Sequence, residues 1–396
     1  TEVPHVPFAE AVKLVAGFGK TLFYSSENGK GNVAGYRLFP KSNIMKFGWV
    51  GGNLGVACGM LAYSEHTGDE EARRQAIATV QFFVRNSQAG VEGLFYGDYH
   101  IGSKWSSRTI VGESALGISS RQFGENLEPL VSLVELGRRL KLPETDEWLA
   151  TLKKAGDFLL RSPRYRELFP QAWTPNGKAL GWPTNGEPKP GKVSAAGAQC
   201  VVVLARLATL TGEAKYRDAA VKAMDAYWRE FGETLAIPPW GATLDGGCED
   251  EESGWGLMRA ALAVHEVTRD PRFIAMAKDA ADWTLTWMYF HNIDLKPESG
   301  LLHEHLRTVG WTFISRQNQE IGAFAYFFAP DYYRLGQVAN DERYRQIGRV
   351  LFEASTQTLS RPGAMFGPVP GIQGEHYNHS NCTYLPGQPW RGSQHS

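Results

Sequence analysis

A six-residue pattern, Ser-Arg-Gln-x-x-Glu, occurs twice in the chain, at residues 120–125 and 315–320, and the two copies are 195 residues apart. Each copy ends in a glutamate, Glu125 or Glu320, and carboxylates are common general acids and bases. Helix capping explains the serines, but a capping box places its acid three residues after the cap, and these glutamates come five residues after. The pattern therefore predicts that at least one of the two glutamates is functional.

Basic and amide side chains accompany both glutamates: Arg121 with Gln122, and Arg316 with Gln317. A guanidinium binds a carboxylate through two parallel hydrogen bonds, so these residues suit a sugar that carries a carboxylate. We predict that all four residues bind substrate. The alternative is that Arg121 and Arg316 are structural partners of the neighbouring glutamates.

The densest group of acids lies at residues 248–255, Cys-Glu-Asp-Glu-Glu-Ser-Gly-Trp. Four carboxylates at the start of a predicted buried helix repel one another, which raises the pKa of some of them and suits a general acid. We predict catalytic roles for Asp250, Glu251 and Glu252. The alternative is an acid-rich first helical turn that Asp250 caps.

A third polar group lies near the C-terminus, in residues 373–381, which show neither helical nor strand periodicity. Such a segment orders when it packs over another surface. We therefore expect it to cover the cavity, with His376 and Tyr377 moving protons and His379 binding substrate. The alternatives are a loosely ordered tail or a metal site formed by Glu375, His376 and His379. We predict no metal and no cofactor.

Aromatic residues are frequent in the segments expected to be loops: Tyr96, Tyr99, Trp105, Trp173, Trp182, Trp240 and Trp311. An indole ring matches the apolar face of a pyranose and stacks on it, although some of these rings belong to the core. We predict that Trp182, Trp240 and Trp311 bind sugar. Together with the nearby arginines, they indicate an acidic carbohydrate as the substrate.

Turns of one kind recur along the chain, at residues 66–70, 210–214, 267–271 and 338–342, with a looser copy at 142–146. Each turn follows an apolar stretch and precedes an amphipathic one, which is the pattern of a helical hairpin with a buried first helix. Five such hairpins are predicted to begin near residues 52, 125, 196, 252 and 319. Residues 8–24 and the C-terminal tail supply a sixth.

Six hairpins of this kind predict an all-α fold, a closed toroid or (α/α)6 barrel, because a ring buries every inner helix on all sides. An open superhelical array is the alternative, and the variable hairpin lengths disfavour it. Long insertions rich in Trp, Gly and Pro, at residues 173–192 and 237–247, precede inner helices. They are therefore expected to gather at one mouth of the ring. We predict a single domain over residues 1–396.

The composition is that of an ordinary globular protein, with 43% hydrophobic and 21% charged residues. The formal net charge of −1 leaves no basic excess to attract nucleic acid. No run of about 18 apolar residues occurs, which excludes a membrane-spanning helix, and the four cysteines show no C-x-x-C spacing. We expect a soluble protein, periplasmic or secreted rather than cytoplasmic, and no pattern indicates its oligomeric state.

Taken together, the predicted hairpins, the Trp-rich loops and the acids resemble the six-hairpin glycosidase superfamily. The arginines make the chain similar to bacterial β-glucuronidases and unsaturated glucuronyl hydrolases. The resemblance covers the plan of nearly the whole chain and rests on architecture and on the positions of the clusters. It implies that Glu252 or its neighbours and Glu320 act as acid and base in a glycoside hydrolase. The enzyme would remove a uronic-acid-type sugar from an oligosaccharide or polysaccharide.

Two other reactions belong to related helical toroids. Polysaccharide lyases neutralise a uronate carboxylate and remove its C5 proton with Tyr or His, and here Tyr377, His376 and Arg316 would serve. Sugar 2-epimerases of the N-acylglucosamine type have about this length and resemble the pattern at residues 247–255. They place a histidine in that cluster, where this chain has Cys248. A non-catalytic carbohydrate-binding module is disfavoured, because it seldom needs 396 residues and three charged clusters.

Overall fold

The computed structural model describes residues 5–28, 31–48, 52–106, 117–180, 195–235, 251–295, 297, 300–313, 321–322, 325–364, 366–367, 369–374 and 376–377. Within these residues the chain is mostly helical, and small antiparallel sheets accompany the helices.

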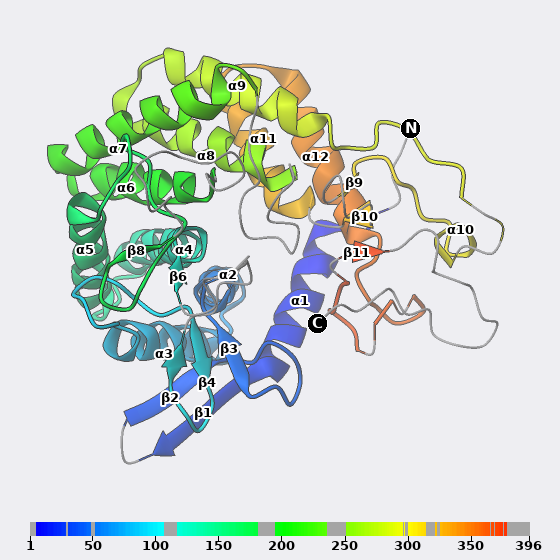
Figure 1. The fold of residues 1–396 in the computed structure, drawn as a ribbon. Coiled ribbons are helices and arrows are strands. Elements are labelled where there is room, and N and C mark those ends of the chain that lie inside the picture. Colours follow the sequence, from blue (N-terminus) through cyan, green and yellow to red (C-terminus); the bar gives the residue numbers. More distant parts are fainter. Residues whose placement is uncertain are drawn as a thin grey trace.

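The long helices form two concentric layers (Figure 1). The inner layer contains α2 (Asn53–Thr67), α4 (Ser120–Arg139), α6 (Ala198–Thr211), α8 (Glu251–Thr268) and α11 (Ala325–Val338). The outer layer contains α3 (Glu70–Asn86), α5 (Thr145–Arg161), α7 (Ala214–Tyr227), α9 (Arg272–Leu285) and α12 (Glu342–Thr356). Each outer helix follows an inner helix and packs against it. The architecture is the predicted (α/α)6 barrel.

The division into layers follows from the distribution of buried residues. Every residue at the start of α8, from Glu251 to Met258, is buried, because neighbouring elements surround this helix. By contrast, α12 buries one stripe that includes Tyr344, Leu351 and Ala354 and leaves its other side exposed. In the described part of the chain, no helix is long and apolar enough to cross a membrane.

The turns inside the hairpins share one backbone feature. Each contains a residue in the left-handed conformation, with φ between 48° and 74°: Gly68, Lys141, Gly212, Arg269 and Asn340. Glycine and asparagine adopt this conformation readily, which explains part of the recurring sequence pattern. At two of the turns an aspartate then caps the outer helix: Asp69 accepts a hydrogen bond from the Ala72 amide (3.0 Å), and Asp341 accepts one from the Arg343 amide (3.0 Å). The recurring turns are therefore the points where inner helices end.

Helix α1 (Phe8–Leu22) completes the ring between α12 and α2 (Figure 1). It contacts α2 and α3 on one side. On the other side the rings of Phe8 and Phe352 lie 5.7 Å apart, and the Val6 amide donates to Thr356 Oγ1 at 2.9 Å. The prediction of a helix near residues 8–24 is confirmed, whereas residues 378–396 of the predicted sixth hairpin lie outside the described residues.

Short strands lead into the inner helices. Strand β6 (Ile118–Ser119) pairs with β7 (Ala172–Trp173), which pairs with β8 (Ala179–Leu180). Strand β10 (Ile321–Gly322) lies between β9 (Thr312–Phe313) and β11 (His376–Tyr377). A third sheet contains β3 (Ile44–Lys46), β4 (Asp98–His100) and β5 (Trp105–Ser106), and β1 (Phe23–Asn28) with β2 (Gly31–Tyr36) forms a hairpin. Because inner and outer helices alternate in direction, the N-terminal ends of the inner helices lie at one face of the ring. That the Trp-, Gly- and Pro-rich insertions gather at this face stays a prediction.

Three shorter helical segments complete the described structure. A 3-10 turn, η1 (Ala195–Gly197), leads into α6, a π-helix, η2 (Trp228–Gly232), continues α7, and α10 (Gly300–His303) lies between α9 and β9. Two predicted hairpin starts were wrong: α4 begins at Ser120 rather than near 125, and α11 begins at Ala325 rather than near 319. The first Ser-Arg-Gln-x-x-Glu copy itself forms the start of its helix, whereas strand β10 separates the second copy from α11.

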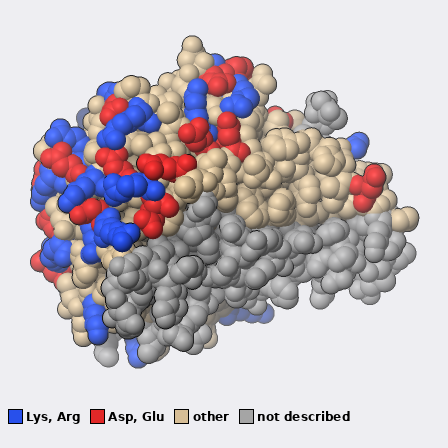
Figure 2. Space-filling model, turned by 45° about the horizontal axis from the view of Figure 1, so that its top comes forward, with Lys and Arg blue, Asp and Glu red and all other residues tan. Residues whose placement is uncertain are grey.

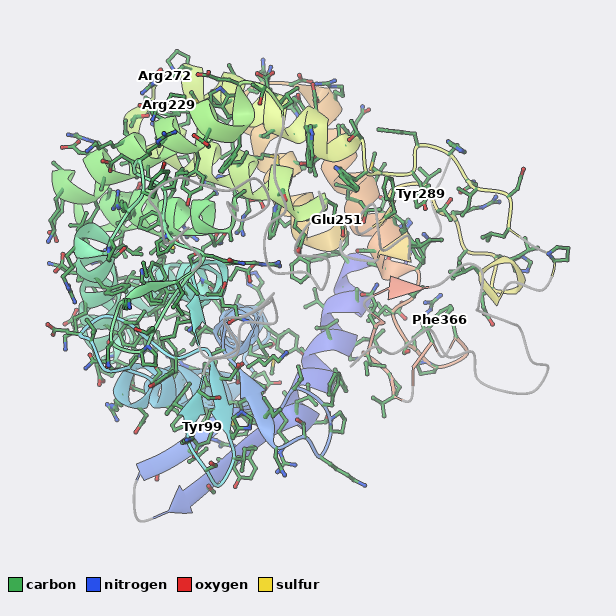
Figure 3. The ribbon with its side chains drawn as sticks, in the orientation of Figure 1. Tyr99, Arg229, Glu251, Arg272, Tyr289 and Phe366 are labelled. Carbon is green, nitrogen blue, oxygen red and sulfur yellow. The ribbon has the colours of Figure 1, made fainter. Side chains whose placement is uncertain are left out.

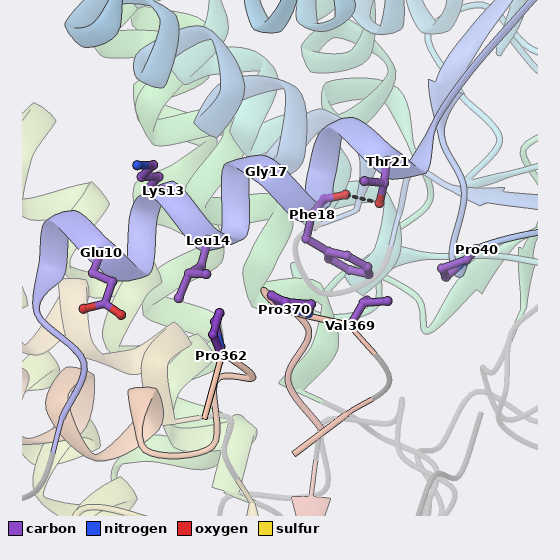
Figure 4. Close-up of a pocket in the computed structure, with 10 residues that line it drawn as sticks. All are labelled: Glu10, Lys13, Leu14, Gly17, Phe18, Thr21, Pro40, Pro362, Val369 and Pro370. Atoms are coloured by element: carbon purple, nitrogen blue, oxygen red, sulfur yellow. Dashed lines mark hydrogen bonds between the residues drawn. The ribbon is translucent and has the colours of Figure 1, made fainter. Parts of the chain in front are cut away.

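A cleft of about 750 Å³ runs along α1 (Figure 4). Helix α1 contributes Leu14, Gly17 and Phe18 to its lining, and the segment after α12 contributes Val369 and Pro370. The lining is mostly apolar and includes none of the predicted site residues. This cleft therefore does not correspond to the predicted active site.

Candidate active site

Three of the predicted site residues form one buried cluster, which we call the Arg121 cluster: Arg121, Glu125 and Glu252. The Arg121 guanidinium donates from Nη1 to Glu252 Oε2 and from Nη2 to Glu252 Oε1, both at 2.7 Å. Its Nε donates to Glu125 Oε1, also at 2.7 Å. The three side chains are 0%, 5% and 8% exposed, respectively. The structure thus brings together Glu125 and Glu252, two carboxylates that were predicted to be catalytic. Arg121 pairs with both of them, which corresponds to the structural role given above as the alternative to substrate binding.

The cluster joins two inner helices that are not neighbours in the ring. Arg121 and Glu125 lie in the first turns of α4, and Glu252 lies at the start of α8, 131 residues away. Between these helices lies α6, whose start contains only small side chains, in Ala195, Ala196, Gly197 and Ala198. Both α4 and α8 contact this turn. Small residues at this point leave room for the long Arg121 side chain to reach across to Glu252.

Electrostatics keep Arg121 charged. Burial by itself disfavours the cation, but the carboxylates of Glu125 and Glu252 outweigh burial and raise the pKa of Arg121 above its ordinary value. Both carboxylate oxygens of Glu252 accept a hydrogen bond from the cation, an arrangement that can stabilise developing positive charge or accept a proton, whereas a proton donor must come from another group.

A second polar cluster, which we call the Arg259 cluster, follows farther along the same helices: Glu128, Gln199, Trp255, Arg259 and Asp331. Arg259 donates from Nη2 to Glu128 Oε1 at 2.5 Å, and its Nε lies 3.1 Å from Asp331 Oδ2. Gln199 Nε2 donates to Glu128 Oε2 at 2.7 Å. The indole N–H of Trp255 donates to Asp331 Oδ2 at 2.8 Å. These contacts connect α4, α6, α8 and α11 across the middle of the ring.

The Arg259 cluster contains acids from opposite walls. In the ring order α2, α4, α6, α8, α11 and α1, Glu128 on α4 stands opposite Asp331 on α11. Sequence reasoning placed an opposed pair at Glu125 and Glu320 instead. Glu320 lies outside the described residues, so the opposition of Glu125 and Glu320 stays a prediction.

Two other predicted residues lie near the start of the inner helices. The side chain of Glu251 is fully buried. Figure 3 shows it on the inward side of the ring, whereas Arg229 and Arg272 lie on the outer rim. Gln122 is also buried and packs so closely against Gly48 that a Cβ at that glycine would lie 2.7 Å from the Gln122 carbonyl oxygen. A substrate-binding role for Gln122 stays a prediction.

The aromatic platforms predicted from sequence are partly wrong. Trp311 is fully buried, and its Nε1 donates to the Ala354 carbonyl at 2.7 Å. It packs in a small core with Leu301, Ile321 and Phe366, so neither ring face is open to a sugar. Trp173, named among the loop aromatics, is fully buried as well, edge-on to Phe158 with ring centres 5.3 Å apart. Neighbouring side chains cover both indoles, a property that residue type does not reveal.

Several predicted site residues lie outside the described residues: Trp182, Trp240, Asp250, Arg316, Gln317, Glu320 and His379. The backbone of His376 and Tyr377 forms strand β11 and pairs with β10, with Tyr377 opposite Ile321. The backbone of these two residues, which were predicted to move protons, therefore lies beside strand β10. This strand begins at Ile321, directly after Glu320, and precedes α11.

Sequence reasoning missed Glu128, Arg259 and Asp331. Signals for all three were present. Asp331 is the single acid of a mostly apolar inner helix, Glu128 stands three residues after Glu125, and Arg259 stands seven residues after Glu252. Spacings of three and seven residues place side chains on one face of a helix. Among the described residues, no group of three or more His, Cys, Asp or Glu side chains has the arrangement of a metal site.

Comparisons with known proteins give similarity at the level of structure. The sequence matches no family model and no curated protein. Solved structures with a similar fold include a D-mannose isomerase (TM-score 0.60, 12% identity, covering 98% of this chain and 96% of that chain). A sugar epimerase from a ruminal bacterium has a TM-score of 0.62 at 12% identity, covering 95% and 92% of the two chains. The unsaturated glucuronyl hydrolase of Bacillus sp. GL1 has a TM-score of 0.52 at 13% identity, covering 94% and 89%. The predicted resemblance to six-hairpin toroid enzymes is confirmed for the fold.

Proposed function

We propose that the protein is a saccharide-processing enzyme, and more specifically a glycoside hydrolase that releases a sugar residue from an oligosaccharide or polysaccharide. The observation that carries the proposal is the Arg121 cluster, which holds two carboxylates at the N-terminal ends of inner helices α4 and α8. Segments remote in sequence converge at this end of a rigid ring, which is where binding and chemistry are usually found. The fold shared with the glucuronyl hydrolase supports the same assignment.

In the proposed reaction, water adds to the anomeric carbon while the glycosidic C–O bond breaks. Glu252, ion-paired with Arg121, faces the positive charge that develops on the sugar ring or takes the proton from the attacking water. The leaving oxygen receives its proton from a second carboxyl group, for which we propose Glu251 or Glu320. Glu125 shares the charge of Arg121 and fixes the orientation of the guanidinium.

The acidic sugar predicted from sequence needs a cation that is free to bind it. Arg121 is fully buried and already donates to Glu125 and Glu252, so it cannot receive a substrate carboxylate without giving up one of these pairs. We therefore propose that a uronate, if it is the substrate, is bound by Arg316. A preference for glucuronides over glucosides that is lost in Arg316→Met would support this assignment, and its retention would contradict it.

The second candidate is a sugar 2-epimerase or isomerase. It is favoured by the D-mannose isomerase and the sugar epimerase, whose TM-scores of 0.60 and 0.62 exceed the value of 0.52 for the glucuronyl hydrolase. This reaction moves a proton next to the sugar carbonyl and needs a base such as histidine. The acid-rich segment carries Cys248 where such a histidine is expected, so the base for this reaction would have to come from another part of the chain.

The test is a substrate panel measured with one enzyme preparation. We expect release of p-nitrophenol from p-nitrophenyl glucuronide or another p-nitrophenyl glycoside, or hydrolysis of unsaturated uronide disaccharides. Interconversion of free mannose with fructose or glucose would establish the isomerase or epimerase instead. A rise in absorbance near 235 nm from an intact polyuronate without hydrolysis would establish a lyase.

The matched variants are Glu252→Gln and Glu147→Gln. Both glutamates accept two hydrogen bonds from an arginine, but Glu147 belongs to the exposed Arg85 pair on the outer layer. We expect Glu252→Gln to abolish most turnover and Glu147→Gln to leave it unchanged. Full turnover by a folded Glu252→Gln enzyme would overturn the assignment of the site.

A further inference from the structure

The Arg259 guanidinium lies at the junction of three inner helices. It extends from α8 and contacts Glu128 of α4 and Asp331 of α11, which belong to opposite walls of the ring. Its Cζ also lies 4.6 Å from the centre of the Trp255 ring. Trp255 in turn donates to the same Asp331 oxygen that Arg259 contacts. One planar cation therefore sets the relative placement of α4, α8 and α11 at this level of the ring.

The residues of the Arg121 cluster lie on the same face of α8 as Arg259 and on the same face of α4 as Glu128. On α8, Glu252, Trp255 and Arg259 are spaced by three and then four residues, and on α4 Glu125 and Glu128 are spaced by three. Both spacings keep side chains on one helix face. At 1.5 Å per residue, Arg259 lies roughly 10 Å along α8 from Glu252, and Glu128 roughly 5 Å along α4 from Glu125. A rotation of either helix at Arg259 therefore moves the carboxylates at its start.

The surrounding residues hold the acids of the Arg259 cluster from several sides. Gln199 on α6 donates to Glu128, and Arg206 of the same helix lies 3.7 Å from the same carboxylate. Burial raises the pKa of Asp331, and Arg259 offsets this effect only in part. Arg259 is the cation that both acids contact. Without the forked guanidinium of Arg259, the contact to Glu128 of α4 and the contact to Asp331 of α11 would change together.

We propose that Arg259 is a positioning residue for the active centre: by bridging Glu128 and Asp331 it fixes the rotation of α4 and α8 and thereby the relative orientation of Glu125 and Glu252. This inference rests on the proposed function for its kinetic part. A lysine keeps the charge but offers a single ammonium group, which cannot reproduce the planar bridge between two carboxylates. The site then assembles with its carboxylates misaligned.

The experiment compares Arg259→Lys with Arg343→Lys. Arg343 is a matched control because it also contacts an acid, Asp282 at 3.2 Å, and an aromatic ring, Tyr344 at 4.4 Å, but on the outer helices. We expect Arg259→Lys to lower kcat roughly tenfold or more with little change in KM, because misaligned groups fail in the transition state. Arg343→Lys should leave both constants unchanged. Unchanged kcat in folded Arg259→Lys would overturn the proposal.

Hydrogen–deuterium exchange provides a readout that does not depend on the reaction. In Arg259→Lys we expect faster amide exchange at the starts of α4 and α8, in residues 120–126 and 251–256, and no change there in Arg343→Lys. If Arg259→Lys exchanged these amides at the wild-type rate, the proposed positioning role of Arg259 would be contradicted. If wild-type protein turns over no saccharide at all, the proposed function fails while the exchange comparison still decides the role of Arg259.

A third variant covers the case in which Arg259→Lys does not fold. The triple variant Arg259→Met, Glu128→Gln, Asp331→Asn removes all three charges and leaves no unpaired buried ion. We expect it to fold, to exchange faster at residues 120–126 and 251–256, and to keep the low kcat. Wild-type kcat in the folded triple variant would show that the bridge has no part in positioning the active centre.

Discussion

Two arginines of this protein make nearly the same contact in different surroundings. Arg121 binds Glu252 through two hydrogen bonds of 2.7 Å each, and Arg85 binds Glu147 through bonds of 2.9 and 2.8 Å. Arg121 joins inner helices and is fully buried. Arg85 joins outer helices α3 and α5, where the two side chains are 60% and 40% exposed. Figure 2 shows such a surface, on which basic and acidic side chains alternate.

The difference between these pairs shows that geometry alone does not determine what an ion pair does. Water and salt screen the Arg85 pair, so its net contribution to stability is small. The Arg121 pair has lost its hydration, so each member depends on the other, and removing one leaves a buried charge. The buried pair is therefore the one that can hold a carboxylate in a fixed ionisation state for chemistry.

The largest effect is expected from removing the two arginines. Arg121→Met leaves Glu125 and Glu252 as buried carboxylates without their shared cation and should lower the free energy of unfolding by ~3–5 kcal/mol. Arg85→Met should cost less than ~1 kcal/mol. Urea unfolding monitored by circular dichroism measures both. If the free energy of unfolding fell by the same amount in both variants, burial would not distinguish the Arg121 pair from the Arg85 pair.

Asp331, an acid among the inner helices, is expected to make the free energy of unfolding depend on pH. Burial raises the pKa of this carboxyl, so its ionised form costs stability at neutral pH, and the cost is relieved as the pH falls through the raised pKa. Asp331→Asn keeps an acceptor for the Trp255 indole. We expect the variant to be at least as stable as wild type at pH 7, with the difference shrinking toward pH 4. A loss of the same size at both pH values would contradict this sign.

Salt should affect the coupling energies of the two ion pairs differently. Double-mutant cycles give the coupling energy of Arg85 with Glu147 and of Arg121 with Glu252. In 1 M NaCl the first coupling, expected at ~0.2–1 kcal/mol in dilute buffer, should approach zero. The second should change little, because salt ions do not reach a buried pair. A buried coupling that salt also abolishes would mean that the Arg121 cluster is open to solvent.

The smallest effect is expected from acid titration of the exposed pair. The hydrogen bond from Arg85 holds the pKa of Glu147 below its ordinary value. Such a group stabilises the folded state above its unfolded-state pKa, which is about 4.3, and the stabilisation is lost as the pH falls through the folded-state pKa. Wild type and Glu147→Gln should therefore differ slightly at pH 7 and converge below pH ~4. Urea midpoints that diverge on acidification would contradict the expectation.

Much of the fold is readable from the sequence, because local physics determines it. The recurring turns contain Gly68, Gly212 and Asn340, residue types that favour the left-handed conformation seen there. The hairpin plan, the inward position of Glu251 and the alternative pairing of Arg121 all follow from periodicity and charge. Strand β10, which shifts the start of α11, is too short to leave a periodic signal.

The site was less predictable, because long-range packing assembles it. The pairing of Arg121 with Glu252 spans 131 residues and depends on the small residues at the start of α6. Repetition of a motif drew attention to Glu125 and Glu320, whereas Glu128 and Asp331, which stand opposite each other and share Arg259, belong to no repeated motif. Likewise, whether Trp311 faces solvent or core depends on Leu301 and Phe366, which no local pattern connects to it.

The most direct test of the account is the turnover of Glu252→Gln measured beside Glu147→Gln, on whichever saccharide the wild-type enzyme hydrolyses. If the Arg121 cluster is the active centre, kcat/KM of Glu252→Gln falls by roughly a hundredfold or more, while Glu147→Gln keeps the wild-type value. Circular dichroism spectra of the two variants should match that of wild type. A folded Glu252→Gln protein with wild-type kcat/KM would show that the Arg121 cluster is not the active centre.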